Sequence, residues 1–343
     1  MFRKLSTVIR YFLAAVGAFA CLLFSSYACA DDDSSESTID IFYFDLSNDF
    51  ITLMSKTFDE ETRKIGVNVN SFNAYGDADN QKHQLEYAFK NNHVKIINLV
   101  DPKMAEYCLK KARETKQRLI FFNRHVNPAV FRKYPQAWFV GTDESTSGPL
   151  QAKIITEYLT SNPSVDRNND RTIRTLLLRG EKDSGATLQR SSNSLNTLAG
   201  NMLNISLVAD IVADWSREKA RAITEKILSE HGIENLELII SNNDAMALGA
   251  VEALEKYGYN NAKSGSAVIP VFGIDAIPEA IKAIRDGRMA GTISNDFVEI
   301  ARICVKLAFM DKTDTSTLKK TFKARIEDNG MIYVPYKLVE MAD

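Results

Sequence analysis

The chain has 343 residues, of which 45% are hydrophobic and 25% charged, and its formal net charge is −2. This length exceeds what one hydrophobic core usually serves, so we expect two domains. The balanced charge provides no broad basic surface, which argues against nucleic acid as a partner. The four histidines, at positions 83, 93, 125 and 231, lack the spacing of metal ligands.

The first thirty residues have the pattern of a secretory signal peptide. Arg3, Lys4 and Arg10 precede the apolar run YFLAAVGAFACLLF, and Ala28-Cys29-Ala30 supplies a cleavage site. Residues 31–38 then form an acidic, serine-rich tether. The pattern predicts that the mature chain is exported. An uncleaved membrane anchor and lipidation at Cys29 are the alternatives that the sequence leaves open.

Two cysteines, Cys108 and Cys304, remain in the mature chain. Each is flanked by apolar residues at helical spacing, as Cys304 is by Ile300 and Leu307. This pattern favours small buried side chains over a nucleophile or a disulfide. A bridge between the two stays open at this stage.

From Ile39 onward, short apolar runs alternate with helical patterns of about ten to eighteen residues, which is typical of βαβ units. The runs are IDIFYF, VNVNSF, KIINLV, LIFF, AWFV, IRTLLLR, ISLVAD, LELII and VIPVF. The alternation predicts an α/β fold with parallel sheets.

Polar side chains follow the predicted strands within residues 239–296. Asn243 and Asp244 follow one strand, Asp275 the next, and Asn295 and Asp296 a third. Ligands of open α/β sheets bind outside the carboxyl ends of the strands. Because carboxylates accept hydrogen bonds and amides both donate and accept them, this set suits a ligand made of hydroxyl groups.

Three runs in this region, NNDAMALGAVEAL, PVFGIDAIPEA and AGTISND, closely resemble runs of the periplasmic galactose/glucose-binding protein family. The resemblance extends over nearly all of the mature chain. It implies two Rossmann-like parallel-sheet domains that are joined by a three-crossing hinge and enclose the ligand, the type I periplasmic binding protein fold. We place the crossings near Gln117, Thr292 and Met331. The predicted N-terminal lobe is 39–117 and 297–330, and the C-terminal lobe is 118–292 and 332–343.

The resemblance also implies ligand-binding positions. Phe50 and Trp215 would cover the two faces of a sugar ring, and Arg190 would donate to its oxygens. The full predicted set is Asn48, Asp49, Phe50, Asn98, Ser184, Arg190, Trp215, Asn243, Asp275 and Asn295. Helix capping by Ser47 or Asn48 would by itself account for the first of these loops.

The sequence departs from the family pattern at several of these positions. The order Asn48-Asp49 places an amide where the family has a carboxylate, and Ser184 and Ala186 stand where it has His and Asp. A site that loses a hydrogen-bonding side chain changes its selectivity. We therefore expect a hexose binder with altered preference, for example for a deoxy or substituted sugar.

The segment 166–174, DRNNDRTIR, has oxygen side chains at alternate positions and is similar to the family's calcium loop. The implied ligands are Asp166, Asn168, Asp170 and the distant Glu237. Arg171 replaces the turn glycine and Arg174 replaces a ligand, and a guanidinium has no lone pair to give. Either a calcium ion or an arginine guanidinium could therefore lie among these acidic side chains. We expect that the protein requires no cofactor.

The predicted function is a monomeric solute-binding protein that captures a galactose- or glucose-like monosaccharide for an ABC permease. The alternative is a sugar sensor that docks on a chemoreceptor or sensor kinase, which would use the same cleft. A repressor would need a DNA-binding helix-turn-helix where the signal lies. A glycosidase would need two carboxylates flanking the scissile bond, a pattern that the neighbouring Asn residues weaken. We therefore predict that the chain is not an enzyme.

Overall fold

The computed structural model describes residues 37–261, 266–311 and 313–339. The predicted signal peptide, with Cys29, and most of the predicted tether lie outside these residues. Among the described helices, none has the length and apolar character needed to cross a membrane.

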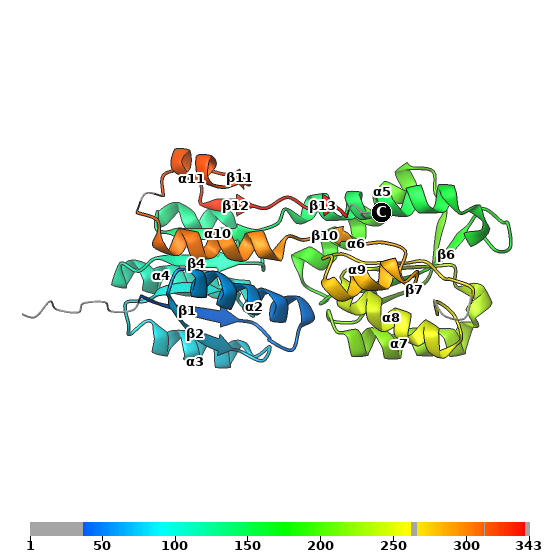
Figure 1. The fold of residues 1–343 in the computed structure, drawn as a ribbon, viewed down its shortest axis with the longest axis horizontal. Helices are drawn as coiled ribbons and strands as arrows, with labels where there is room; N and C mark the ends of the chain where they lie inside the picture. Colours follow the sequence, from blue (N-terminus) through cyan, green and yellow to red (C-terminus); the bar gives the residue numbers. More distant parts are fainter. Residues whose placement is uncertain (1–36, 262–265, 312, 340–343) are drawn as a thin grey trace, which may run out of the picture. The chain divides into compact units, whose positions relative to one another are not determined.

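The first sheet has seven strands in the order β11-β12-β5-β4-β3-β1-β2 (Figure 1). Its strands are parallel, except that β11 pairs antiparallel with β12. The bounds are β1 Thr38–Tyr43, β2 Asn68–Asn73, β3 Val94–Ile97, β4 Leu119–Phe122, β5 Ala137–Gly141, β11 Arg325–Ile326 and β12 Met331–Tyr333.

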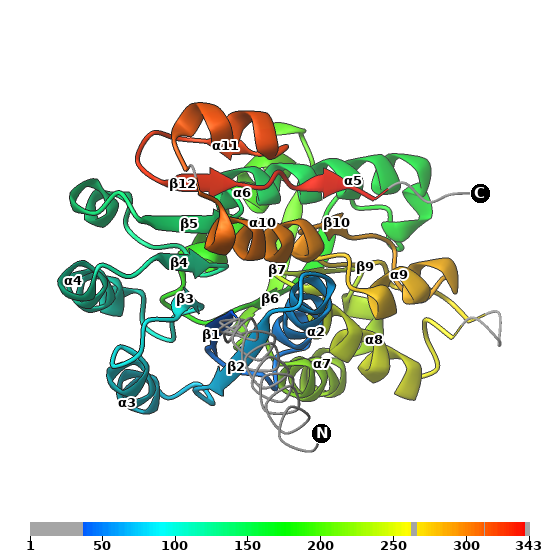
Figure 2. The ribbon, with the colours of Figure 1, turned by 60° about the vertical axis from the view of Figure 1, so that its left-hand side comes forward.

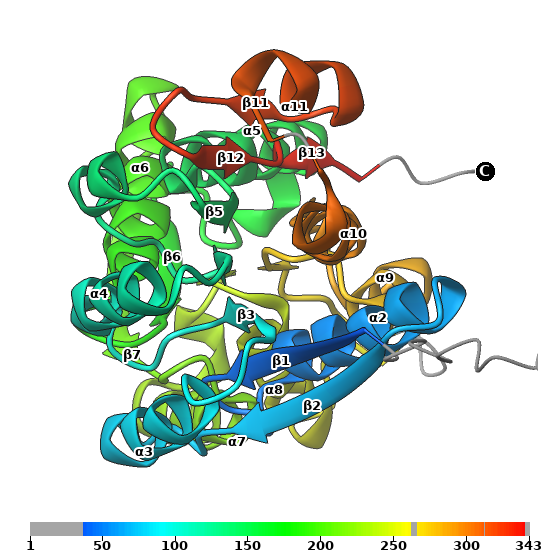
Figure 3. The same cartoon turned by 90° about the vertical axis from the view of Figure 1, so that its left-hand side faces the viewer.

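Helices cover both faces of this sheet. The helices α2 (Asp49–Lys64) and α10 (Phe297–Phe309) lie on one side of β1, and α3 (Ala78–Ala88) and α4 (Ala105–Thr115) on the other (Figure 2; Figure 3). Successive residues of a strand point to opposite faces. Ile41 and Tyr43 of β1 therefore pack in the cluster of α2 and α10, while Phe42 packs with α3 and α4. A short α11 (Thr315–Thr321) precedes β11.

The second sheet has four parallel strands in the order β7-β6-β8-β9. They are β6 (Ile173–Arg179), β7 (Ile205–Val212), β8 (Leu238–Ser241) and β9 (Val271–Phe272). The helices α5 (Ser147–Ser161) and α6 (Gly185–Gly200) cover one face, and α7 (Arg217–His231), α8 (Asp244–Lys256) and α9 (Pro278–Arg285) cover the other. A separate antiparallel pair joins β10 (Ile293–Ser294) to β13 (Lys337–Leu338).

Each of the nine predicted apolar runs contains a strand, so the predicted α/β fold with two parallel sheets is confirmed. Two of the predicted crossings are corrected. Because β4 and β5 belong to the first sheet, the chain first leaves it after Gly141 rather than near Gln117. Because β12 also belongs there, the last crossing lies between Tyr333 and Lys337 rather than near Met331. Periodicity identifies a buried strand but not the sheet that it joins.

Cys108 and Cys304 are both free and fully buried, as the sequence predicted. They belong to different apolar clusters, Cys108 to that of α4 and Cys304 to that of α10, on opposite faces of the first sheet. The sheet between them excludes a bridge. Burial raises the pKa of both thiols, so they are unreactive components of the core.

Candidate ligand-binding site

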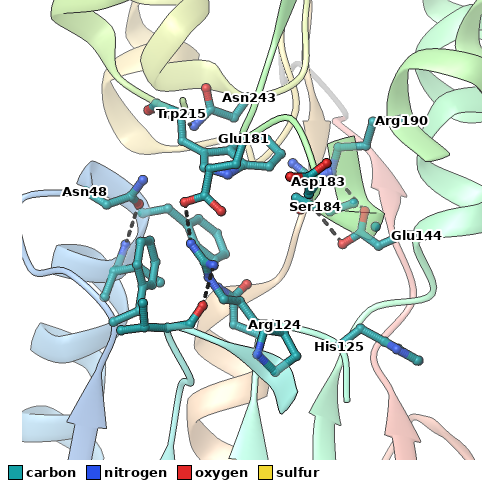
Figure 4. A pocket seen from close by; sticks show the side chains of 18 of the residues that line it. Asn48, Arg124, His125, Glu144, Glu181, Asp183, Ser184, Arg190, Trp215 and Asn243 are labelled. Atoms are coloured by element: carbon teal, nitrogen blue, oxygen red, sulfur yellow. Dashed lines mark hydrogen bonds and ion pairs between the residues drawn. The ribbon is translucent and has the colours of Figure 1, made fainter. Parts of the chain in front are cut away.

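A cavity of about 610 Å³ lies where the carboxyl ends of both sheets meet (Figure 4). The first lobe contributes residues that follow β1, β3 and β4, such as Asn48, Val100 and Arg124. The second lobe contributes residues that follow β6, β7, β8 and β9. This is the position at which parallel α/β sheets bind ligands.

All but two of the predicted ligand-binding residues line this cavity. Those that do are Asn48, Phe50, Ser184, Arg190, Trp215, Asn243, Asp275 and Asn295. They come from both lobes and from positions up to 247 residues apart in the sequence, between 48 and 295. Their shared location makes the cavity the candidate site.

Asp49 and Asn98 are not among the residues that line the cavity. Asp49 begins α2, and burial raises the pKa of its carboxyl above the usual range. Asn98 follows β3 and is fully buried, and neither atom of its side-chain amide has a hydrogen-bond partner. A buried amide without partners is unfavourable in a finished core. A ligand role for these two residues stays a prediction.

Two of the lining amides also cap helices. Asn48 Oδ1 accepts the N–H of Ile51 at 3.2 Å, and Asn243 Oδ1 accepts the N–H of Met246 at 3.0 Å. The capping interpretation of the first loop is therefore confirmed for Asn48. Because the oxygens are engaged in capping, these side chains offer their amide N–H groups as donors, although Asn243 Nδ2 also donates to the carbonyl of Trp215 at 3.5 Å.

Trp215 is held in an unusual backbone conformation at the cavity wall. Its φ is 62° and that of Asp214 is 52°, the left-handed region that large side chains rarely adopt. A Cβ added at Gly180 would overlap indole atoms Cζ2 and Cε2, so only glycine leaves room for the ring. Strain of this kind persists where the surrounding structure enforces it, often at functional sites.

Asp275 lines the cavity and is also strained, with φ at 125°. Its Oδ1 accepts from Asn295 Nδ2 at 3.3 Å, and burial raises its pKa to about 8 although Arg190 is near. Behind it, Asp244 accepts the Thr292 hydroxyl at 2.6 Å and the N–H of Ile277 at 2.9 Å. Burial raises the pKa of Asp244 to about 7. Asp244 thereby fixes the loop that presents Asp275.

Arg124, Glu144 and Glu181 also line the cavity, and the Tyr336 hydroxyl accepts a hydrogen bond from Arg190, but none of these four residues was predicted from the sequence. Arg124 and Glu181 follow strands β4 and β6, so the strand-end rule that found Asn243 would also have found them. Glu144 and Tyr336 lie in the segments that connect the lobes, where the sequence carries no comparable signal.

An ion pair joins the two lobes at the cavity. Arg124 Nη2 lies 2.6 Å from Glu181 Oε1, and the two side chains cross the centre of the view in Figure 4. Arg124 also donates to the carbonyl of Val100 at 3.0 Å, and its guanidinium lies 4.0 Å from the ring centroid of Phe44. Arg124 is thus anchored in the first lobe and bonded to the second.

A family model for the periplasmic binding protein domain matches residues 39–310. The chain belongs to the periplasmic binding protein family. A D-galactose/methyl-galactoside binding periplasmic protein of Haemophilus influenzae is 30% identical over 324 residues, or 93% of each chain. A D-allose-binding periplasmic protein of Escherichia coli is 27% identical over 76% of this chain and 80% of its own.

Solved structures support the fold. An ABC transporter solute-binding protein of Actinobacillus succinogenes, with bound D-allose, has a TM-score of 0.70 and covers 89% of this chain and 97% of its own. The Caulobacter myo-inositol binding protein has a TM-score of 0.68, covering 89% of this chain and 94% of its own. Both are 22% identical to this chain, so the likeness concerns the fold alone.

In this periplasmic binding protein, the segment 166–174 folds around an arginine. Arg174 Nη2 lies 2.6 Å from Asp170 Oδ2, and its Nη1 lies 3.5 Å from Glu237 Oε2. Asp166 accepts the N–H of Arg171, and Asn168 donates to Asp170. Arg171 itself adopts φ at 64°, where a glycine would be unstrained. The guanidinium lies among the oxygen atoms that were predicted as metal ligands.

We expect the thermal stability of the protein to be independent of calcium, because Arg174 already supplies a positive charge to Asp170 and Glu237. A chelator should shift the midpoint of a thermal melt by less than about 1 °C. Replacing Arg174→Gln supplies an oxygen ligand in place of the cation, so this variant should gain several degrees when calcium is added. A wild-type midpoint that falls by many degrees on chelation contradicts the assignment.

The two buried carboxylates should make the ligand-free protein less stable as pH rises. The unfolded chain releases its carboxyl protons near pH 4, whereas Asp275 retains its proton to about pH 8. The folded state therefore binds more protons between these values, and its stability falls across the window. Asp275→Asn should flatten the profile between pH 5 and pH 8 by about 1–3 kcal/mol in urea-melt measurements. Parallel profiles for the variant and the wild type would show that Asp275 is ionised when folded.

Proposed function

We infer that this protein binds a monosaccharide in the cavity between its lobes and delivers it to an ABC transporter in the periplasm. The observation that carries this proposal is the pairing of two aromatic side chains with a ring of amides and carboxylates in one cavity. Phe50 and Trp215 come from opposite lobes. Asn48, Asn243 and Asn295 line the same cavity.

The chemistry of this lining suits a sugar ring. The C–H face of a pyranose is apolar and packs on an aromatic plane, while its hydroxyls point outward from the ring edge. The N–H groups of Asn48, and the N–H of Asn243 that does not donate to the Trp215 carbonyl, can donate to those hydroxyls, and Asp275 can accept from them. A cavity of about 610 Å³ has room for one monosaccharide together with water.

The relatives favour the same class of ligand but not one sugar. Their names cite D-galactose and methyl-galactoside, D-allose and ribose, and one related structure holds myo-inositol. We propose a hexose of the galactose or glucose type with altered preference, since Ser184 and Ala186 offer less hydrogen bonding than larger polar side chains would. The site serves capture without chemistry, in keeping with relatives that are binding proteins.

Calorimetry tests this function directly. The purified mature chain would be titrated with D-galactose, D-glucose, D-allose, D-ribose and myo-inositol. We expect saturable binding of at least one hexose at one site per chain. Absence of heat and of thermal stabilisation with every compound would overturn the proposal.

Trp215 supplies a further prediction. Trp215→Ala should weaken binding of the preferred sugar by about 1–3 kcal/mol, the range for a buried aromatic contact, while the fold is retained. Trp138 is the matched control, because it is buried in the core of the first lobe, remote from the cavity lining. Trp138→Phe should bind sugar normally, and the fluorescence of its remaining Trp215 should change on binding. An unaltered affinity in Trp215→Ala would exclude the stacking role.

A further inference from the structure

The guanidinium of Arg190 is almost fully engaged by protein acceptors. Nε donates to Glu144 at 2.9 Å, and Nη2 donates to Glu144 at 3.2 Å and to the Tyr336 hydroxyl at 2.8 Å. Nη1 donates to the carbonyl of Asn242 at 2.8 Å. An arginine has five N–H donors, so one remains, on an Nη1 that lies 3.7 Å from Asp275. The arginine therefore has no fork free to clamp two ligand oxygens.

Glu144, in contrast, lines the cavity and retains acceptor capacity. A carboxylate offers about four lone-pair positions. Arg190 occupies two of them, and the Tyr336 hydroxyl, 3.0 Å from both carboxylate oxygens, occupies one. The Thr142 hydroxyl lies 3.1 Å from the Tyr336 oxygen and 3.2 Å from Glu144 Oε1, and its single proton can be donated to only one of them. When Thr142 donates to Tyr336, one position on Glu144 is open to a donor in the cavity.

The carboxylate is held from three parts of the chain. Glu144 begins the short helix η3 (Glu144–Thr146) that follows β5, Tyr336 lies between β12 and β13, and Arg190 belongs to α6. The side chain of Glu144 is only 10% exposed. An acceptor that is already oriented and mostly desolvated loses little entropy on binding, and its hydrogen bonds are charge-assisted.

The helix α6, which carries Arg190, has no acidic residue that could pair with it. Ala186 lies one helical turn before Arg190 and also lines the cavity. Residues four apart on a helix are neighbours, so an acidic residue at 186 would face Arg190. With alanine there, the carboxylate that balances Arg190 comes from the hinge segment instead.

We propose that Glu144 is a specificity-determining residue that accepts a ligand hydroxyl, and that Arg190 positions Glu144 rather than clamping the ligand. This inference rests on the proposed function as a sugar-binding protein. It implies that the preferred sugar carries a hydroxyl at the ring position that faces Glu144. A sugar that is deoxygenated or carboxylated at that position would bind weakly, because it leaves Glu144 without a donor or places a second anion beside it.

The test is a thermodynamic cycle in which the Glu144 side chain and single sugar hydroxyls are removed separately and together. Calorimetric affinities of wild type and Glu144→Ala would be measured for D-galactose, D-glucose, the 1-, 2-, 3- and 6-deoxy derivatives of each, and the 4-deoxy sugar that the two have in common. In the wild type, one deoxy derivative should bind about tenfold more weakly than its parent, or worse. In Glu144→Ala the parent should weaken by a similar factor, and that derivative should then bind as well as the parent. Such non-additive losses identify a direct contact between Glu144 and that hydroxyl, whereas a merely structural effect of the substitution would leave the two losses additive.

Two further variants keep the test decisive. Glu144→Gln retains the size of the side chain and serves where the alanine variant does not give a cooperative thermal melt. Glu60→Ala, an exposed site on α2, is the control and should leave all affinities unchanged. If each deoxy derivative loses the same factor in the variants as in the wild type, Glu144 does not contact the ligand and the inference is wrong. Failure of the wild type to bind either parent sugar would instead overturn the proposed function.

Discussion

The two large sheets are parallel except for β11 at the edge of the first, and parallel strands present their carboxyl ends at one edge of a sheet. The two such edges meet at the same cavity, so polar residues at positions as distant as Asn48 and Asn295 come together there. Helices begin immediately after most of these strands, and the same side chains cap them. Asn48 and Asn243 are fixed in orientation by this capping, which leaves defined donors for a ligand. The geometry of the site thus follows from the geometry of the βα turn.

The cavity differs in its electrostatics from a simple ring of amides. Arg190 and Tyr336 are buried and contact the partly buried Glu144, and Asp275 is buried beside Arg190 with a raised pKa. Such groups are stable in a low-dielectric site only when nearly all of their hydrogen bonds are satisfied. Glu144 and Tyr336 belong to segments that connect the lobes, so the charge of Arg190 is hydrogen-bonded to the hinge. The pair Arg124–Glu181 adds a second link between the lobes at the cavity.

Much of this arrangement could be predicted from the sequence. Alternating apolar runs predicted the parallel sheets, and polar strand ends predicted Asn243, Asp275 and Asn295. Sheet membership could not be predicted, because the buried runs of β4 and β5 fit either sheet equally well. Glu144 could not be predicted either, since it acts through contacts with Arg190 and Tyr336 that lie 46 and 192 residues away in the chain. Arg174 was visible in the sequence, but its bond to Asp170 required the folded loop.

A crystal structure of the protein with its tightest-binding sugar tests the central claim most directly. The account predicts one sugar ring in the cavity, between Phe50 and Trp215, with a ring hydroxyl within hydrogen-bond distance of Glu144. It also predicts that Arg190 keeps its bonds to Glu144 and Tyr336. A sugar bound elsewhere on the molecule, or one held by the fork of Arg190 with Glu144 displaced, would contradict the account.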